Sequence, residues 1–231
     1  MLELSPRLKM AAELVRDGSV VADIGTDHAY LPAYLLLNNT VKKALACDLR
    51  KGPLNNAAKT AEIYHLKDRI ELRLSDGFDS ISKGEADDFI ICGMGGSLIA
   101  ELFERTPWLK NPEYRFIIQP QSHSNDVRKY LAENGFVIQK EVACFDECRV
   151  YNAMVAAFTG NTPDLQPSYE FFGLLLYNKD EASAYSVKRT LDYLKVRYKA
   201  ESEYGDPEEA EKLKAIITDA EEKINENQRI I

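Results

Sequence analysis

Three carboxylates stand at the ends of three successive apolar runs in the first half of the chain. Asp23 ends SVVAD, Asp48 ends KKALACD 25 residues later, and Asp76 closes IELRLSD. A carboxylate at a strand end can accept hydrogen bonds from ribose hydroxyls or from an ammonium group. Each of them alone is more often an ordinary turn residue. Three in succession favour a cofactor site in which Ser75, Asp76 and Gly77 hold an adenine edge.

The stretch DIGTDHAYLP, residues 23–32, turns from the first run into a helix-compatible segment. Gly25 gives the turn a permissive backbone, and the amides after it can hold a polar ligand at the start of the helix. A dinucleotide-binding turn would carry the pattern GxGxxG, which is missing. We expect Gly25 and Thr26 to bind the cofactor, and Asp27 and His28 to act on the substrate. Alternatively, Thr26 and Asp27 only cap the helix, which does not exclude ligand binding.

A fourth apolar run ends in CGMGG, residues 92–96. Its glycines allow the backbone to approach a cofactor or a base closely, and Met94 offers an apolar wall beside a reacting group. The fifth run is followed by a polar QPQ segment, residues 119–121. The expected cofactor contacts here are Gly93, Met94 and Gly95, and the expected substrate contacts are Gly96, Gln119 and Gln121.

The elements that must position these residues alternate along the chain. Apolar runs at residues 19–24, 42–49, 70–76, 86–93 and 114–121 are typical of buried parallel strands, with helix-compatible stretches at residues 29–38, 51–64, 97–104 and 125–134. A first helix starts at Ser5-Pro6, with the serine hydroxyl as expected N-cap. It carries Arg7, a candidate phosphate contact, although a surface arginine without a ligand is the commoner case. This alternation predicts an α/β fold with a doubly wound, Rossmann-like sheet and ligand-binding loops at the strand ends.

The pattern changes at Gly135, which breaks the last of these helices. Residues 136–158 then form two β-like runs with no room for a crossover helix, so they must pair as an antiparallel hairpin around residues 146–148. A parallel sheet closed in this way is typical of S-adenosylmethionine-dependent methyltransferases and not of dinucleotide-binding folds. We therefore predict S-adenosylmethionine as cofactor and S-adenosylhomocysteine as product.

The chemistry of the methylated atom can be narrowed from the same segments. Enzymes that methylate the exocyclic amine of adenine usually carry an Asn/Asp-Pro-Pro-aromatic element where this chain has CGMGG. Its absence favours attack through a ring nitrogen, because a ring lone pair needs no prior deprotonation.

Composition is that of an ordinary soluble protein, with 45% hydrophobic residues and a mean hydropathy of −0.33. The first residues offer neither a signal-peptide core nor a membrane-length run, so we expect a cytoplasmic protein without a membrane partner. The four cysteines contain no CxxC pair, which favours reduced core thiols over metal ligands, and no metal is expected. A net charge of −8 disfavours nonspecific nucleic-acid binding, so a polyanionic partner must meet a local basic patch.

The chain loses strand character after a polar boundary at residues 160–167. Apolar residues then recur at helical spacing on both sides of the YGDP segment 204–207, which predicts an antiparallel helical hairpin. We expect a methyltransferase domain at residues 1–160 and a coiled-coil-like hairpin domain at residues 161–231. Residues 186–199 carry five basic side chains and one acidic, a local charge of +4. From charge alone, a solvated helix surface and a surface that binds nucleic-acid phosphates are about equally favoured. If the helix binds nucleic acid, the expected contacts are Lys188, Lys195 and Lys199.

The motifs LSPRL, DIGTDHAYLP, CGMGG and QPQ, followed by the helical hairpin, closely resemble the bacterial tRNA (adenine-22-N1)-methyltransferase family. The resemblance covers essentially the whole chain, and DxGTDHxYLP together with GMGG is specific. It implies methyl transfer from S-adenosylmethionine to N1 of an adenosine in the tRNA D-arm, with the helical domain helping to hold the tRNA. It fixes neither a catalytic base nor the hairpin face that contacts tRNA.

The expected reaction is an in-line displacement, in which a flipped adenosine presents N1 to the sulfonium methyl. Asp27 is predicted to stabilise the cationic product base and take its N6 proton directly or through water, while His28 positions base or cofactor. Two alternatives stay open: a methyltransferase of another RNA or small substrate, and a non-catalytic RNA-binding scaffold. A nicotinamide-dependent dehydrogenase is disfavoured by the missing glycines. We expect a monomer, and the sequence does not specify which tRNAs are substrates.

Overall fold

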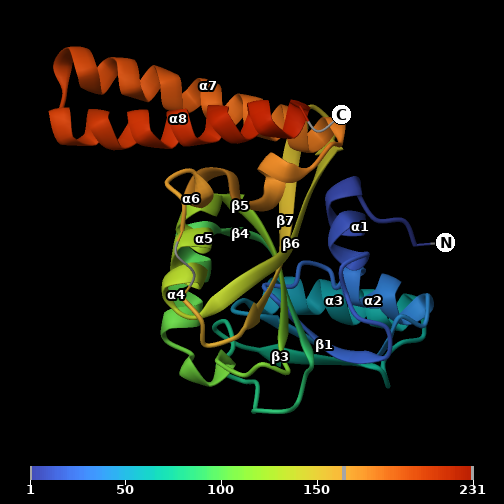
Figure 1. Cartoon of the computed structure of the whole chain (residues 1–231). Coiled ribbons are helices and arrows are strands. Elements are labelled where there is room, and N and C mark those ends of the chain that lie inside the picture. Colours follow the sequence, from blue (N-terminus) through green and yellow to red (C-terminus); the bar gives the residue numbers. More distant parts are fainter. Residues whose placement is uncertain (1, 163–164, 230–231) are drawn as a thin grey trace.

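A seven-stranded mixed sheet forms the centre of the molecule (Figure 1), in a computed structural model that describes residues 2–162 and 165–229. Its strands have the spatial order β3-β2-β1-β4-β5-β7-β6. Their bounds are β1 Ser19–Ile24, β2 Val41–Asp48, β3 Ile70–Leu74, β4 Asp88–Gly95, β5 Arg115–Ser122, β6 Phe136–Asp146 and β7 Arg149–Phe158. Strands β1 to β5 are parallel, and β7 runs antiparallel to both of its neighbours, β5 and β6. The predicted methyltransferase-type sheet is confirmed.

Helices cover both faces of this sheet. One face packs on α1 (Pro6–Ala12), α2 (Tyr30–Leu37) and α3 (Lys51–Ile63), which contribute Met10, Leu35 and Ala57 to one apolar core. The other packs on α4 (Gly96–Glu104), the short 3₁₀ helix η1 (Pro107–Leu109) and α5 (Ser124–Glu133). Strands β1 and β4 are neighbours although β2 and β3 separate them in sequence. Loops after β1 and β4 therefore diverge to opposite faces and open a crevice, where open α/β sheets bind ligands.

The five predicted parallel strands and the four helices after them lie within two residues of their expected bounds. Two capping expectations are wrong. Ser5 occupies the N-cap position of α1, but its side chain makes no capping hydrogen bond. The N-cap residue of α2 is Ala29, which also receives no side-chain cap. Thr26 and Asp27 therefore do not cap α2, because the turn continues for two further residues before the helix begins.

A helical hairpin follows the sheet, formed by α7 (Glu181–Tyr204) and α8 (Pro207–Arg229), and projects beyond one end of the sheet (Figure 1). The connecting helices α6 (Tyr169–Phe172) and η2 (Gly173–Tyr177) were not expected from the sequence. Their apolar residues Phe172 and Leu176 join Leu194 and Leu213 of the hairpin in one buried cluster. Residues 163 and 164 of the predicted domain boundary lie outside the described residues, and the division at residues 160/161 stays a prediction.

A buried ion pair fixes the connecting helices to the sheet. Arg128 on α5 donates from Nη2 and Nε to Glu141 Oε1 on β6, at 2.6 and 3.0 Å, and both side chains are almost fully buried. Arg128 Nη1 also donates to the carbonyls of Glu170 and Phe171, at 3.0 and 2.9 Å. The amide of Leu174 donates to Glu141 Oε2 at 2.9 Å. The base of the hairpin is therefore tied to the central sheet by charge-assisted hydrogen bonds.

Candidate active site

A cavity of about 870 Å³ opens at the carboxyl ends of the parallel strands. Its walls come from the segment around α1, from the ends of β1 to β4 and the turns after them, from α4 and from Gln121 near the end of β5. Most of the predicted site residues line it: Arg7, Asp23, Gly25, Asp27, His28, Asp48, Ser75, Asp76, Gly77, Gly93, Met94 and Gln121. Residues from six separate parts of the sequence thus meet at one crevice.

Seven predicted contacts do not line this cavity: Thr26, Gly95, Gly96, Gln119, Lys188, Lys195 and Lys199. Gly96 has a packing role, since a Cβ there would collide with the backbone of His123 at the start of α5. Gln119 is fully buried behind the cavity wall. Gly95 is the last residue of β4 and the N-cap of α4, and Gly96 is the first residue of that helix. Both glycines therefore serve the strand-to-helix turn and do not line the cavity.

Asp23 is a buried carboxylate at the centre of the crevice. Burial raises its pKa to about 6, and the Asp48 carboxylate adds to this increase. The nearby Thr26 hydroxyl acts in the opposite direction and lowers this pKa. Thr26 Oγ1 is itself buried, and among the described residues no group lies in hydrogen-bonding geometry with it. A buried hydroxyl without a partner and a carboxylate of raised pKa both favour a polar, cationic ligand at this point.

Asp48 is held at the end of β2. Its Oδ1 accepts the backbone amide of Arg50 at 2.7 Å, while the carboxylate still faces the cavity. The exposed side chain of Leu49 lies beside it on the cavity wall. A fixed carboxylate next to an apolar surface suits a ribose with an attached adenine.

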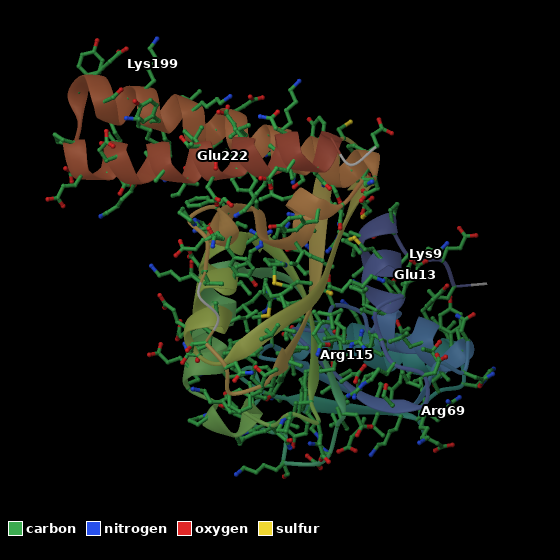
Figure 2. All side chains as sticks on the ribbon, in the orientation of Figure 1. Lys9, Glu13, Arg69, Arg115, Lys199 and Glu222 are labelled. Atoms are coloured by element: carbon green, nitrogen blue, oxygen red, sulfur yellow. The ribbon has the colours of Figure 1, made fainter. Side chains whose placement is uncertain are left out.

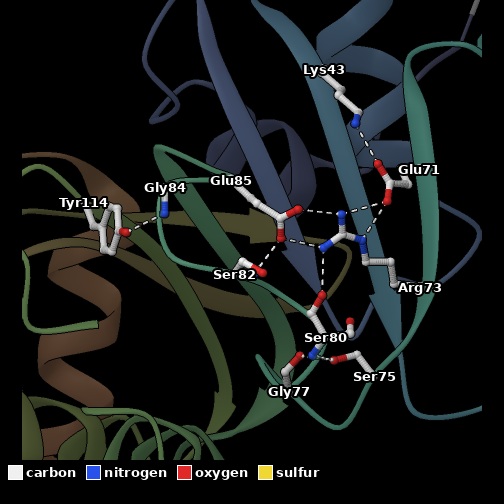
Figure 3. Close-up of polar contacts among 10 residues, drawn as sticks. All are labelled: Lys43, Glu71, Arg73, Ser75, Gly77, Ser80, Ser82, Gly84, Glu85 and Tyr114. Carbon is white, nitrogen blue, oxygen red and sulfur yellow. Dashed lines mark hydrogen bonds and ion pairs between the residues drawn. The ribbon is translucent and has the colours of Figure 1, made fainter. Parts of the chain in front are cut away.

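The loop after β3 is anchored by Arg73 (Figure 3). Arg73 donates to Glu71, to Glu85 and to the carbonyl of Ser80, each with a contact of 2.7 Å. The hydrogen bond from Arg73 to Glu85, together with that from the Ser82 amide, lowers the pKa of Glu85 to about 2. Both ends of the loop at residues 75–85 are thus fixed from the sheet.

Within this loop, Ser75 and Gly77 shape the cavity wall. Ser75 Oγ donates to the carbonyl of Gly77 at 2.9 Å and accepts the Ser80 amide at 3.1 Å (Figure 3). Gly77 has φ +58, and a Cβ there would collide with Leu102. Asp76 is bound in a bidentate manner by Arg105, the C-cap residue of α4, at 2.5 and 3.1 Å, which lowers the pKa of the carboxyl. Asp76 therefore meets a ligand as a carboxylate already paired with a guanidinium.

Arg7 reaches the cavity from α1 and is held on three sides. Its Nη1 donates to Gln119 Oε1 at 3.3 Å, and its Nε lies 3.9 Å from Asp146 Oδ2. The guanidinium lies 5.8 Å from the centre of the Tyr151 ring. A Cβ at Gly93 would approach Arg7 Nη1 and Gln121 Oε1 to 3.7 and 3.9 Å. Arg7 and Gln121 thus form a polar wall directly over the glycine of the fourth strand end.

Asp27 and His28 also line the cavity, in the turn before α2. His28 Nε2 lies 3.5 Å from Asp27 Oδ1, and the imidazole stacks on Tyr30 with ring centres 5.1 Å apart. His28 and Ala29 both have positive φ, at 61 and 52 degrees. Successive non-glycine residues in this region cost about 1–3 kcal/mol each and are concentrated at functional sites. The turn therefore adopts a strained backbone conformation in which these side chains line the cavity.

The predicted basic face of the hairpin is partly neutralised. Lys195 Nζ lies 2.6 Å from Glu221 on α8, and Lys199 Nζ lies 4.0 Å from Glu203. Figure 2 shows Lys199 near the far tip of the hairpin. Among the described residues Lys188 makes no ion pair. The lysines that were predicted as nucleic-acid contacts lie outside the cavity, and their role stays a prediction.

Several cavity residues escaped the sequence analysis. Arg105 directly follows α4 and has no motif around it, and Tyr30 is the first residue of α2. Asp146 and Tyr151, which contact the cavity residue Arg7, belong to the β6–β7 hairpin far along the chain. Tyr30 lies within the DIGTDHAYLP stretch, which was the one available signal. The others depend on tertiary neighbours that spacing does not reveal.

The donor set and the fold fit S-adenosylmethionine. Asp23 and Asp48 suit an ammonium and a ribose, Gly25 has φ +76 with Met94 packed against it, and Leu98 and Leu102 supply apolar surface. Among the described residues, no group of three or more His, Cys, Asp or Glu side chains is placed to hold a metal ion. Nor does any helix there have the length and apolar character needed to span a bilayer. Fold and site together define a Rossmann-like S-adenosylmethionine-dependent methyltransferase.

Comparison with known proteins narrows the class. The family model "Methyltransferase domain" matches residues 4–154. The chain is 39% identical over 155 residues to the tRNA (adenine(22)-N(1))-methyltransferase of Bacillus subtilis (strain 168), an alignment that spans 67% of this chain and 65% of that relative. The chain belongs to the tRNA (adenine(22)-N(1))-methyltransferase family.

Solved structures agree over nearly the full length. The B. subtilis M1A22 tRNA methyltransferase TrmK superposes with a TM-score of 0.84 at 32% identity, covering 97% of this chain and 100% of that one. M. capricolum TrmK in complex with S-adenosyl-homocysteine superposes with a TM-score of 0.79 at 26% identity, covering 96% and 98%. The likeness includes the helical hairpin as well as the sheet.

Proposed function

We propose that this protein transfers a methyl group from S-adenosylmethionine to N1 of adenosine 22 in the D-arm of tRNA. The observation that carries the proposal is the likeness over nearly the whole chain, hairpin included, to a tRNA (m1A22) methyltransferase. The crevice supports it, because carboxylates, turn glycines and apolar residues that suit the cofactor lie beside a second polar wall of Arg7 and Gln121. Adenosine N1 needs no deprotonation before attack, which agrees with a site without an obligatory base.

The residues divide into a cofactor side and a base side. S-adenosylmethionine supplies, when bound, an electrophilic methyl group on a sulfonium centre. Asp23 holds the ammonium end and Asp48 the ribose, while Ser75 and Gly77 shape the adenine wall. Met94, packed on Gly25, keeps water from the reacting centre.

Asp27 and His28 act on the base. Methylation at N1 leaves a cationic adenine, and the exposed Asp27 carboxylate stabilises this charge and accepts the N6 proton directly or through water. His28, stacked on Tyr30, positions the base. Arg7 contacts a phosphate or the base edge, and the hairpin, through Lys188 and its neighbours, holds the body of the tRNA. The enzyme acts as a cytoplasmic monomer.

The test is methyl transfer from labelled S-adenosylmethionine to unmodified tRNA transcripts, followed by nucleoside analysis. We expect 1-methyladenosine, lost when adenosine 22 is replaced by guanosine. Transfer to a different position, or only to another RNA or a small molecule, would contradict the proposed substrate but would still identify a methyltransferase. Tight cofactor binding without any transfer would point to a different substrate, and absence of cofactor binding would support the scaffold alternative.

A further inference from the structure

A second cavity, of about 330 Å³, adjoins the cofactor crevice. The two cavities share Gln121, and the second is also lined by Tyr151, the ring beneath Arg7. Its most basic residues are Arg149, at the start of β7, and Arg189, on α7. The sheet and the hairpin therefore contribute one guanidinium each to a single pocket beside the active site.

Neither guanidinium is neutralised within the described part of the chain. Arg149 and Arg189 are exposed and form no ion pair there. Asp146, which pairs in register with Arg149 across the β6–β7 hairpin, directs its carboxylate to Arg7. Asp192 lies three residues after Arg189 and forms no ion pair with it. Two positive charges thus face one polar pocket without a partner carboxylate.

The other cations of α7 contrast with this pair. Lys195 and Arg197 are bound by Glu221 and Glu209 of α8, at 2.6 and 3.0 Å. Among the described ion pairs of α7, the cations without a partner are Lys188 and Arg189, near the start of the helix, where α7 meets β7. Ser186 Oγ, hydrogen-bonded to Asn152 Oδ1 at 3.1 Å, fixes this junction.

Exposed aromatic side chains flank the pocket. Tyr185 and Tyr193 lie one turn before and one turn after Arg189 on α7, with 49% and 57% of their surface exposed. The ring of Tyr185 packs edge-on against the exposed Phe145 of the β6–β7 hairpin, 5.5 Å between centres. Guanidinium groups interleaved with exposed aromatic rings are the combination that binds single-stranded RNA, by phosphate contact and base stacking.

We propose that Arg149 and Arg189 bind a backbone phosphate next to the adenosine that enters the active site, with Tyr185 stacking on an unpaired neighbouring base. This assignment rests on the proposed tRNA function. A planar guanidinium on each side of a phosphodiester gives bidentate recognition. Because one arginine comes from the sheet and the other from the hairpin, the pocket couples tRNA docking on the hairpin to base delivery in the crevice.

The test compares Arg149→Ala, Arg189→Ala and the double variant with wild type. The control is Lys83→Ala, which removes an exposed cation from the loop between β3 and β4, outside both cavities. Binding of unmodified tRNA transcript to the S-adenosylhomocysteine-loaded protein is measured at several salt concentrations, with cofactor binding by calorimetry alongside. Each arginine variant is expected to lose about tenfold in tRNA affinity and to reduce the salt slope by about one, with cofactor affinity unchanged.

Wild-type affinity and salt slope in the double variant would overturn the proposal, as would equal losses in Lys83→Ala. Arg149→Lys and Arg189→Lys are expected to restore the salt slope but only part of the affinity, since lysine keeps the charge and loses the planar fork. These binding measurements do not depend on turnover. If wild type binds tRNA with the expected slope but fails to form 1-methyladenosine, the proposed function fails while the phosphate pocket stands.

Discussion

Arg7 Nη1 donates to Gln119 Oε1 at 3.3 Å, joining the first helix to the fifth strand across 112 residues of sequence. Gln119 is fully buried, and its Nε2 donates to the carbonyl of Pro120 at 3.0 Å. Its amide is thus locked with the oxygen toward Arg7. Gln119, predicted as a base contact, instead acts as a positioning residue for the arginine that faces the cavity.

Substitution of these two residues should reveal the coupling. Arg7→Ala is expected to lower kcat/KM for tRNA by about tenfold or more, because a charge-assisted contact is lost. Gln119→Met, similar in volume, should lower it less, since Asp146 still holds Arg7. The double variant should resemble Arg7→Ala, because Gln119 acts only through Arg7. Steady-state methylation of tRNA measures this, and additive losses would contradict it.

Asp23 should make both stability and cofactor binding depend on pH. Its pKa is about 6 in the folded protein, against 3.8 ordinarily, so between these values the folded protein binds more protons than the unfolded chain. The stability contributed by this group is full below about pH 4 and is lost as the pH rises through about 6, with an upper limit of about 3 kcal/mol. Asp23→Asn should therefore be more stable than wild type near pH 7.5 in urea unfolding, by about 1–3 kcal/mol.

The same carboxylate must be ionised to hold an ammonium. Cofactor affinity of the wild type should fall by about tenfold from pH 7 to pH 5, while Asp23→Asn should bind weakly and without this dependence. Calorimetric titration at several pH values measures both. Parallel pH profiles of the two proteins would remove Asp23 from the cofactor site.

Gly77 and Gly84 provide a matched pair in the loop after β3. Both have positive φ, at +58 and +81, but a Cβ at Gly77 would meet Leu102 and Arg105, whereas nothing lies within 4 Å at Gly84. Alanine at either position should cost about 1–2 kcal/mol of unfolding free energy for the left-handed backbone. Gly77→Ala should cost more and also weaken cofactor binding. Urea unfolding measures the stability of each variant, and calorimetry measures its cofactor affinity. Equal effects of the two substitutions would show that Leu102 moves aside without cost.

The Arg128–Glu141 pair should stabilise the packing of the helical hairpin against the sheet. Arg128→Met leaves a buried carboxylate and two carbonyls without their donor, and should destabilise the protein by about 3–5 kcal/mol. Adding Glu141→Leu should restore part of this loss, because no buried charge then remains. Thermal unfolding measures stability, and the KM for tRNA reports the seating of the hairpin. A single variant as stable as wild type would contradict the role of this pair.

The local pattern of the chain predicted most of the fold, because strand runs, turn glycines and the hairpin at Gly135 are encoded by neighbouring residues. The cofactor side of the site followed from them, since carboxyl ends of parallel strands meet at one edge. The partners that orient this site were invisible in sequence. Gln119 lies in a motif yet points to Arg7, and Arg105 reaches Asp76 across 29 residues, because only the packing of α4 and α1 on the sheet brings them together.

Asp27 gives the sharpest test of the chemistry on the base. Its side chain lines the cavity and is 78% exposed, and its one ion pair among the described residues is with His28, so removal should leave the fold intact. Asp27→Ala is expected to slow single-turnover methylation, with cofactor and tRNA prebound, by about a hundredfold, because the cationic product base loses its counter-charge and proton acceptor. Asp27→Asn should be similarly slow, since an amide keeps the shape and lacks both properties.

The matched control is Asp68→Ala, which removes an exposed aspartate just before β3. This variant should react at the wild-type rate. Prebinding both ligands separates chemistry from affinity, because a loss confined to binding would disappear under these conditions. If Asp27→Ala methylates at nearly the wild-type rate, the carboxylate has no part in the transfer. The reaction would then proceed by orientation of N1 alone, with the N6 proton released to solvent.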